Sequence, residues 1–273
     1  ILLGTRLRDL RESAGISRDD AAYAIRGSAS KISRLEMGRV RCKLRDVSDL
    51  LDMYGVRDDA GRTQLLDMAA QACAPAWWRP FRDVVPGSLE TCLGLEPSAS
   101  LIRTYDAAFI PALLHTPDYA LAVHSMAAGD ADDASVRQRA GLVTRRQQIL
   151  HRPEPPKVWA LIDEAALRRP VGGPAVLRVQ LEYLSQAITM DNVRIQVMPI
   201  SAGIALPGAP ITLLRFPHDG LGDVVCLEQL GTAEYRTRPT ETLGYWSALN
   251  RLATLARPPA ATASLLQDVL AGT

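Results

Sequence analysis

Short helical stripes of apolar residues, separated by glycines, fill the first 38 residues and limit the fold more than any other feature of the chain. Apolar residues fall at positions 3, 7, 10 and 14, which is the period of a helix, and Gly15 follows where a helix commonly ends in a left-handed residue. Ser17, with Asp20 three positions later, has the pattern of an N-cap for a second helix, which Gly27 ends. The sequence therefore predicts two helices before Gly27.

A third helix is predicted after this turn, because Ser28 can cap it and Gly38 can end it. Further helices are predicted over 45–54 and 58–74. Two short helices joined by a glycine-containing turn, with helices before and after them, are what a helix-turn-helix requires. We therefore expect an all-α N-terminal helix-turn-helix domain of five helices over residues 1–74.

The rest of the chain mixes strands and helices. Strands are predicted at 157–162, 193–199, 211–216 and 223–229, and helices near 117–128, 132–150, 175–189, 240–256 and 262–271. The helix between the first two strands implies that they are parallel, and the short connection between the last two implies that they are antiparallel. We expect a larger α+β domain over 101–273 with a small mixed sheet of about four strands. The segment 75–100, rich in Pro, Gly and Trp and without a clear period, is interpreted as a junction.

Basic residues are concentrated around the third predicted helix. The net charge of the chain is only +1, but positions 26–45 hold seven Lys or Arg and one Glu, which is typical of a surface that binds phosphates. A helix that enters the major groove must also present small or hydrogen-bonding side chains. The outward positions of the third helix offer such a set: Ala29, Ser30, Lys31, Ser33 and Arg34. Double-stranded DNA is therefore the expected partner.

Two groups of segments resemble known families. GTRLRDLRESAGISRDDAAYAI, followed by RGSASKISRLEMGR, resembles the lambda-repressor-like (Xre) family of helix-turn-helix regulators. Later segments resemble the uncharacterised C-terminal domain of antitoxin-like regulators from filamentous soil bacteria: WWRPF (77–81), LEPSASLIRTYDAAFIPALLHTPDYA (95–120), RRQQIL (145–150), IDEAALRR (162–169), QLEYL (180–184) and IQVMPI (195–200). The resemblance covers nearly the full chain and implies a sequence-specific DNA-binding transcription regulator. The alternative is an antitoxin-like protein that binds a small protein encoded by an adjacent gene and regulates its own promoter.

The resemblance places the base-reading positions of the family on Ala29, Ser30 and Arg34, with Lys31 and Ser33 beside them. Arg34 can hold a guanine edge with two hydrogen bonds, worth about 1–3 kcal/mol of discrimination. The alternative is an arginine that touches only phosphate. Ala29 can offer only a methyl contact to thymine.

Two further groups of residues follow from the resemblance. Contacts to phosphates, which position a domain without reading sequence, are expected from Ser17, Arg18, Ser28, Arg39, Arg41 and Lys43. The alternative is that these six residues are solvated on the surface and do not contact DNA. Arg11 and Glu36 match family positions that form a partly buried ion pair, and this pair is expected to hold the third helix against the domain.

Residue types that commonly hold metals or perform catalysis lack the required spacing. The histidines show no H-E-x-x-H or i, i+4 pattern, and the four cysteines stand far apart without C-x-x-C spacing. The S-x-x-K pattern at 28–31 lacks the partner motifs of penicillin-binding enzymes. Asp163 and Glu164 have the pattern of an N-cap and a first-turn charge. We therefore expect reduced cysteines, no metal, no cofactor and no enzymatic activity.

Five aromatic residues in and after the junction form another candidate site: Trp77, Trp78, Phe81, Tyr105 and Phe109. They could line an apolar ligand pocket, or they could pack in a core or a domain interface. The chain has no apolar run near the roughly 18 residues that a membrane span needs, and its first residues do not resemble a secretory signal. We expect a cytoplasmic homodimer whose C-terminal domain dimerises and receives a signal from an effector that the sequence does not identify.

Overall fold

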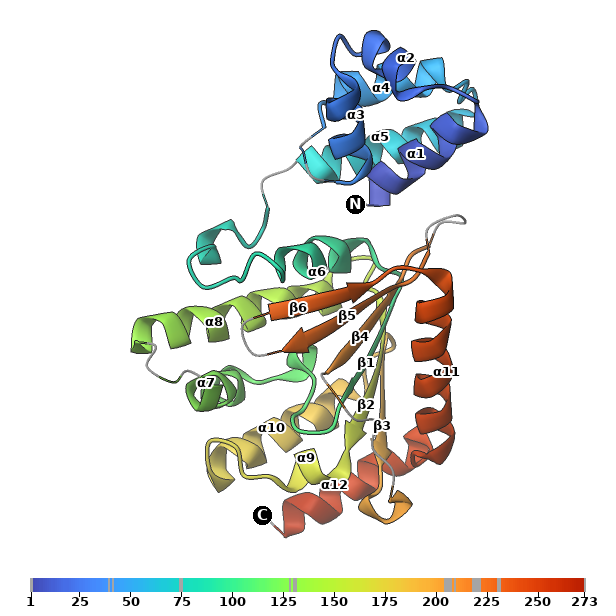
Figure 1. Ribbon diagram of the computed structural model, residues 1–273. Coiled ribbons are helices and arrows are strands. Elements are labelled where there is room, and N and C mark those ends of the chain that lie inside the picture. The colour runs from blue at the N-terminus through green and yellow to red at the C-terminus, as the bar shows by residue number, and fades with distance from the viewer. Residues whose placement is uncertain are drawn as a thin grey trace. The chain divides into compact units, whose positions relative to one another are not determined.

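The computed structural model describes residues 2–38, 40, 42–73, 76–127, 129, 132–203, 208, 210–217, 222–229 and 232–272. Contacts divide these residues into two compact units, with the boundary after Trp77 (Figure 1). The regular elements described in the first unit are all helices, and the second unit combines a six-stranded sheet with helices. Among the described residues, no helix is long and apolar enough to cross a membrane.

The first unit contains the five helices that the sequence predicts. They are α1 (Leu2–Ser13), α2 (Arg18–Ala24), α3 (Ala29–Glu36), α4 (Leu44–Met53) and α5 (Asp59–Cys73). Leu7 of α1, Ile32 of α3, and Leu50 and Leu51 of α4 are completely buried. Together with residues of α2 and α5 they form one hydrophobic core, so the orientation of α3 is set by packing against the whole unit.

Short polar contacts begin the two helices of the helix-turn-helix, as the sequence predicts. The Ser17 Oγ accepts a hydrogen bond from the Asp20 backbone N at 3.1 Å, at the start of α2. The Ser28 Oγ accepts one from the Lys31 backbone N at 3.2 Å, at the start of α3. Each serine thus satisfies a backbone donor that the first turn of a helix leaves unpaired.

Gly4 allows the beginning of α1 to pack against the end of α3. A Cβ atom at this position would lie 2.5 Å from the carbonyl oxygens of Leu35 and Glu36, a separation that a methyl group cannot adopt. Only glycine therefore permits the two helix ends to approach this closely.

The second unit is built on one mixed sheet with the strand order β3-β2-β1-β4-β5-β6. The strands are β1 (Leu101–Asp106), β2 (Lys157–Asp163), β3 (Val193–Met198), β4 (Ile211–Arg215), β5 (Val224–Gln229) and β6 (Thr232–Arg236). β2 pairs in parallel with β1 and β3, and the remaining neighbours are antiparallel. The predicted parallel pair β2–β3 and the predicted antiparallel pair β4–β5 are both confirmed.

The expectation of about four strands is wrong, because the sheet has six. The first missing strand is β1, which lies at the centre of the sheet between β2 and β4. Arg103 and Thr104 interrupt its apolar run, yet both are buried. The Arg103 guanidinium lies between the rings of Trp159 and Trp246, 4.2 and 4.6 Å from their centroids, and donates to the Asn250 Oδ1 at 2.6 Å. Two aromatic rings that are distant in the sequence thus accommodate the charge of Arg103 inside the fold. Because this charge interrupts the apolar run, a search for sequence patterns does not identify β1.

The second missing strand is β6, at the edge of the sheet. Ala233 is its only buried residue, and Thr232 and Glu234 are exposed. An edge strand with one covered position carries little hydrophobic alternation, so the sequence pattern does not reveal it.

Helices cover both faces of the sheet (Figure 1). α11 (Pro239–Leu255) lies on one face, where its Leu249 and Leu252 pack with Leu213 of β4 and Val225 of β5. On the other face lie α6 (Glu90–Leu95), α7 (Pro117–Ala127), α8 (Asp133–Arg146) and α10 (Pro174–Ala187). α9 (Glu164–Arg168) follows β2, and α12 (Thr262–Ala271) packs on β3 and α10. Asp163 caps α9 through its side chain, as predicted. The segment from Trp78 to 100, which lacks a clear sequence period, belongs to the second unit and contains α6.

His115 is a buried histidine that the fold holds uncharged. Its Nε2 lies 2.5 Å from the Ile110 carbonyl oxygen, its ring packs edge-on against Tyr119, and its Nδ1 is buried without a partner among the described residues. Burial lowers the pKa of His115 from 6.5 to about 4. Protonation would place a second N–H where no acceptor is described, and the charges of His124 and Arg146 also lower the pKa of His115.

We predict that the second unit loses stability as the pH falls from 6.5 towards 4. Above pH 6.5, His115 is neutral in both the folded and the unfolded chain, and its contribution to the free energy of unfolding is complete. Between pH 6.5 and 4 the unfolded chain binds a proton at this histidine that the folded chain does not bind, so folding becomes less favourable. The total loss is roughly 3 kcal/mol. Thermal unfolding as a function of pH should show a shallower decline for His115→Gln than for the native chain. The exposed residue His151 supplies the control, and a slope equally reduced by His151→Gln would contradict the assignment.

Candidate nucleic-acid interface

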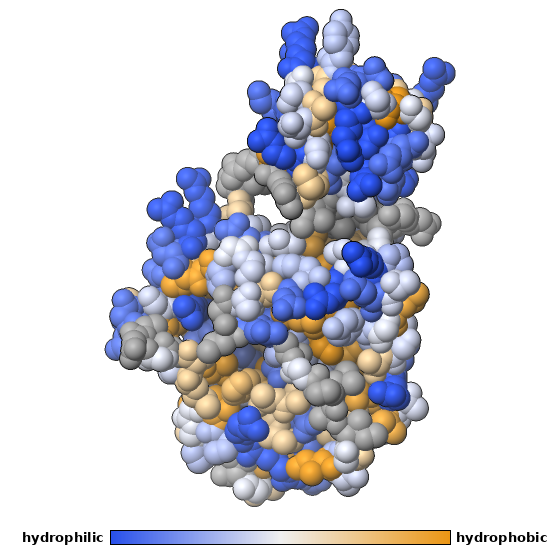
Figure 2. All heavy atoms as spheres, viewed as in Figure 1, coloured by the Kyte–Doolittle hydropathy of each residue, from blue (hydrophilic) through white to orange (hydrophobic). Residues whose placement is uncertain are grey.

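The outer face of α3 presents two polar side chains one helical turn apart. Ser30 and Arg34 are exposed, and the Arg34 Nε donates to the Ser30 carbonyl oxygen at 3.3 Å. Ala29 and Ser33 are half-buried beside them. In the view of Figure 2 the surface of the first unit is largely hydrophilic. Ser30 and Arg34 are therefore the members of the predicted base-reading set that face solvent most fully.

Lys31 belongs to the same predicted set but points towards α4. Its Nζ lies 2.6 Å from the Asp46 Oδ2, and the Asp46 side chain is only 12% exposed. The pair joins the first turn of α3 to the first turn of α4. Lys31 would have to give up this ion pair in order to reach a base.

The residues expected to contact phosphate lie in different environments. Ser17 and Ser28 serve as helix caps, and Lys43 is exposed directly before α4. Arg18 is about half exposed, and its Nε lies 3.4 Å from the Glu36 Oε2. Arg39 and Arg41 lie outside the described residues.

Behind this surface, Arg11 and Glu36 form a two-point ion pair between α1 and α3. The Arg11 Nε lies 2.5 Å from the Glu36 Oε1, and the Nη2 lies 3.2 Å from the Oε2. The Arg11 Nη1 also donates to the Ile16 carbonyl oxygen at 3.0 Å. The two side chains are only 7% and 2% exposed. The hydrogen bond to Glu36 raises the pKa of Arg11 above its ordinary value, so the guanidinium stays charged inside the unit.

Arg26 is a surface residue that the sequence pattern does not identify. It occupies the turn between α2 and α3 with φ +49°, the only positive φ of a non-glycine residue among those described. A left-handed backbone conformation costs a non-glycine residue about 1–2 kcal/mol. Gly27, which could adopt this conformation without that cost, directly follows Arg26. The pattern assigns the turn to Gly27, but the strained position carries an exposed positive charge at the entrance to α3.

Tyr23 is a second exposed residue close to α3, and its side chain on α2 is 89% exposed. It lies off the helical stripe of Ala21, Ala22 and Ile25, which is buried. Its exposure places an apolar ring beside the turn that leads to α3.

The five aromatic residues predicted as a possible ligand site lie on separate elements. Trp77 ends the first unit, Trp78 packs on α6 and Phe81 packs on α8. Tyr105 is buried in the core between the sheet and α11, on the opposite face of the sheet, and Phe109 is half-buried after β1. The structure does not gather the five side chains into one group.

A cavity of about 490 Å³ lies elsewhere in the first unit. Its lining comes from α1, the α4–α5 turn and α5, and includes Arg6, Leu10, Arg57 and Leu65. No residue of α2 or α3 and none of the five aromatic residues contributes to it. The candidate DNA-binding surface on α3 is thus separate from this cavity.

Comparison with known proteins agrees with this architecture. Residues 2–65 match the family model described as "Helix-turn-helix domain", and this match, with the arrangement of α2 and α3, indicates a DNA-binding domain of the helix-turn-helix class. Residues 89–268 match the model described as "Domain of unknown function (DUF5753)", and the chain belongs to this family. No curated protein and no solved structure matches the chain.

We predict that Glu36→Gln destabilises the first unit by about 3–5 kcal/mol, because it removes the buried carboxylate that holds the Arg11 guanidinium at two points and leaves only the surface ion pair with Glu12. Glu12→Gln is the matched control: Glu12 contacts Arg8 and Arg11 at the surface, with 48% of its side chain exposed. That change should cost no more than about 1 kcal/mol. Hydrogen exchange of α1 and α3 peptides, with thermal unfolding, measures both losses. Equal small losses would mean that the buried pair does not hold α3 in place.

Proposed function

We propose that the protein is a sequence-specific transcription regulator that inserts α3 into the major groove of duplex DNA. The exposed pair Ser30 and Arg34 carries this proposal, because both side chains leave the same face of α3 and can form hydrogen bonds. In this role Arg34 holds the edge of a guanine through two hydrogen bonds, and Ser30 contacts the neighbouring base.

The ion pairs behind α3 support this proposal by fixing the helix. Glu36 is tied to Arg11 at its C-terminal end, and Lys31 is tied to Asp46 near its N-terminal end. Base readout requires side chains placed within a fraction of an ångström, so a helix secured at both ends suits it. Lys31 then positions α3, and base contact falls to Ser30 and Arg34.

Phosphate contacts are assigned to the exposed basic residues around α3. Arg26 extends from the strained turn before the helix, and Lys43 lies directly before α4. Both are exposed and form no ion pair with any residue that the structure describes. Contacts of this kind set the register of the domain on DNA and make its affinity depend on salt.

The second unit is assigned the roles of dimerisation and signal reception. A single helix-turn-helix buries little surface on DNA, and two-fold symmetry supplies the additional contact that specific binding needs at physiological salt. The partner encoded by an adjacent gene, expected as an alternative from the sequence, stays a prediction.

Substitution of two arginines should separate base reading from phosphate binding. For a duplex selected by the native protein from a random pool, Arg34→Ala should reduce the preference over unrelated DNA by about 1–3 kcal/mol. Arg26→Gly should keep that preference but lower the slope of log affinity against log salt by about 1. Fluorescence anisotropy at several salt concentrations measures both quantities.

Arg57→Ala is the control for these two changes, because Arg57 is an exposed arginine in the lining of the cavity. It should leave both the preference and the salt slope unchanged. If Arg34→Ala and Arg57→Ala behave alike on the selected duplex, α3 does not read bases and the proposal fails.

Dimerisation is tested by comparing the full chain with residues 1–77, which have a hydrophobic core of their own. We expect the full chain to sediment as a dimer and the fragment to sediment as a monomer that binds the selected duplex more weakly. A fragment that dimerises and binds as tightly as the full chain would contradict the role given to the second unit.

A further inference from the structure

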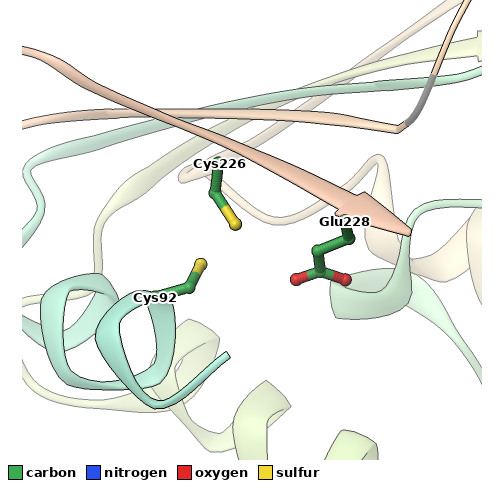
Figure 3. Close-up of side chains that lie close together, drawn as sticks. All are labelled: Cys92, Cys226 and Glu228. Carbon is green, nitrogen blue, oxygen red and sulfur yellow. The ribbon is translucent and has the colours of Figure 1, made fainter. Parts of the chain in front are cut away.

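Two cysteines and a glutamate lie together inside the second unit, far from the candidate DNA-binding surface in the sequence. Cys92 belongs to α6, and Cys226 and Glu228 belong to β5. Their sulfur atoms and a carboxylate oxygen all lie within 4.8 Å of one another, and Figure 3 shows the three side chains converging. Both cysteines are completely buried, and neither forms a disulfide.

The fold produces this cluster by strand alternation and by the docking of α6. Residues 226 and 228 are two positions apart on β5, so their side chains leave the same face of the sheet. α6 packs over that face, and the Tyr235 hydroxyl of β6 accepts a hydrogen bond from the Cys92 backbone N at 3.0 Å. The same hydroxyl donates to the Ser88 carbonyl oxygen. The position of Cys92 over β5 is therefore fixed at the backbone.

An arginine orients the carboxylate of the cluster. The Arg146 Nη2 of α8 donates to the Glu228 Oε1 at 3.0 Å, and the Arg146 Nε donates to the Glu96 Oε2 at 2.7 Å. None of the residues that the structure describes is hydrogen-bonded to the Glu228 Oε2. Metal-binding carboxylates are commonly held by a hydrogen bond, here from Arg146 to one oxygen, which leaves the other oxygen for the metal.

We propose that Cys92, Cys226 and Glu228 bind a zinc ion. Two sulfurs and one carboxylate oxygen form a donor set that zinc takes in tetrahedral geometry, with water at the fourth position. The Glu228 side chain is 29% exposed and marks the side from which the ion and its water enter.

The charges around the cluster agree with a bound divalent cation. With zinc bound, both cysteines would be thiolates. Together with Glu228 and Glu96 they would carry four negative charges, against the three positive charges of zinc and Arg146. Zinc would thus be nearly neutralised by its surroundings, as a buried ion requires. The site connects α6 to the sheet and stands independently of DNA binding by the first unit.

The test uses the full chain purified under reducing conditions. We expect one equivalent of zinc per chain by elemental analysis, and a thiolate-to-metal charge-transfer band in the near ultraviolet when cobalt replaces zinc. Cys226→Ser should remove most of that band. Glu228→Gln keeps both sulfurs but removes the anionic ligand. It should weaken zinc binding by at least ~10–100-fold, which is the loss typical when a residue that only hydrogen-bonds to a ligand is changed.

The double variant Cys42→Ser/Cys73→Ser is the control, because it changes only the two cysteines outside the cluster. It should bind zinc like the native chain. A chain without zinc or a cobalt charge-transfer band would overturn the proposal. So would a Cys92–Cys226 disulfide that forms in place of metal binding, or a metal signal that the control variant loses.

Discussion

The ion pair between Arg11 and Glu36 joins most of the first unit at one buried point. Arg11 connects α1 to the α1–α2 turn through Ile16, and Glu36 also receives Arg18 of α2. A buried charge is tolerated only where its partner is correctly placed, so the pair penalises every other arrangement of these helices. The exposed face of α3 is held in a fixed orientation because Glu36, on the buried side of the same helix, is tied to Arg11.

The helical unit could be predicted from sequence because its signals are local. The apolar period and the serine caps of α2 and α3 lie within a few residues of the structure that they specify. The sheet could be predicted only in part. β1 contains Arg103, whose burial depends on Trp159 and Trp246, which are 56 and 143 positions away. A pattern search over neighbouring residues cannot weigh such contacts, and it therefore does not identify β1.

The candidate site shows the same division between local and distant information. The exposed positions Ser30 and Arg34 follow from the helical period of α3. The ion pair of Lys31 with Asp46 does not, because its partner lies 15 positions away on α4. The sequence pattern does not identify Arg26 for another reason. Glycine is the residue that ordinarily adopts a left-handed conformation, but here the arginine before Gly27 adopts it.

The central position of β1 has a consequence for the order of folding. β1 pairs with β2 and with β4, whose residues are synthesised long after it, so the sheet cannot close until most of the chain has left the ribosome. The first unit has its core within residues 3–69 and relies on helices adjacent in the chain. During synthesis it is expected to fold first, as N-terminal domains generally do. In a nascent chain α3 would thus be folded before β2 and β4 are available to pair with β1.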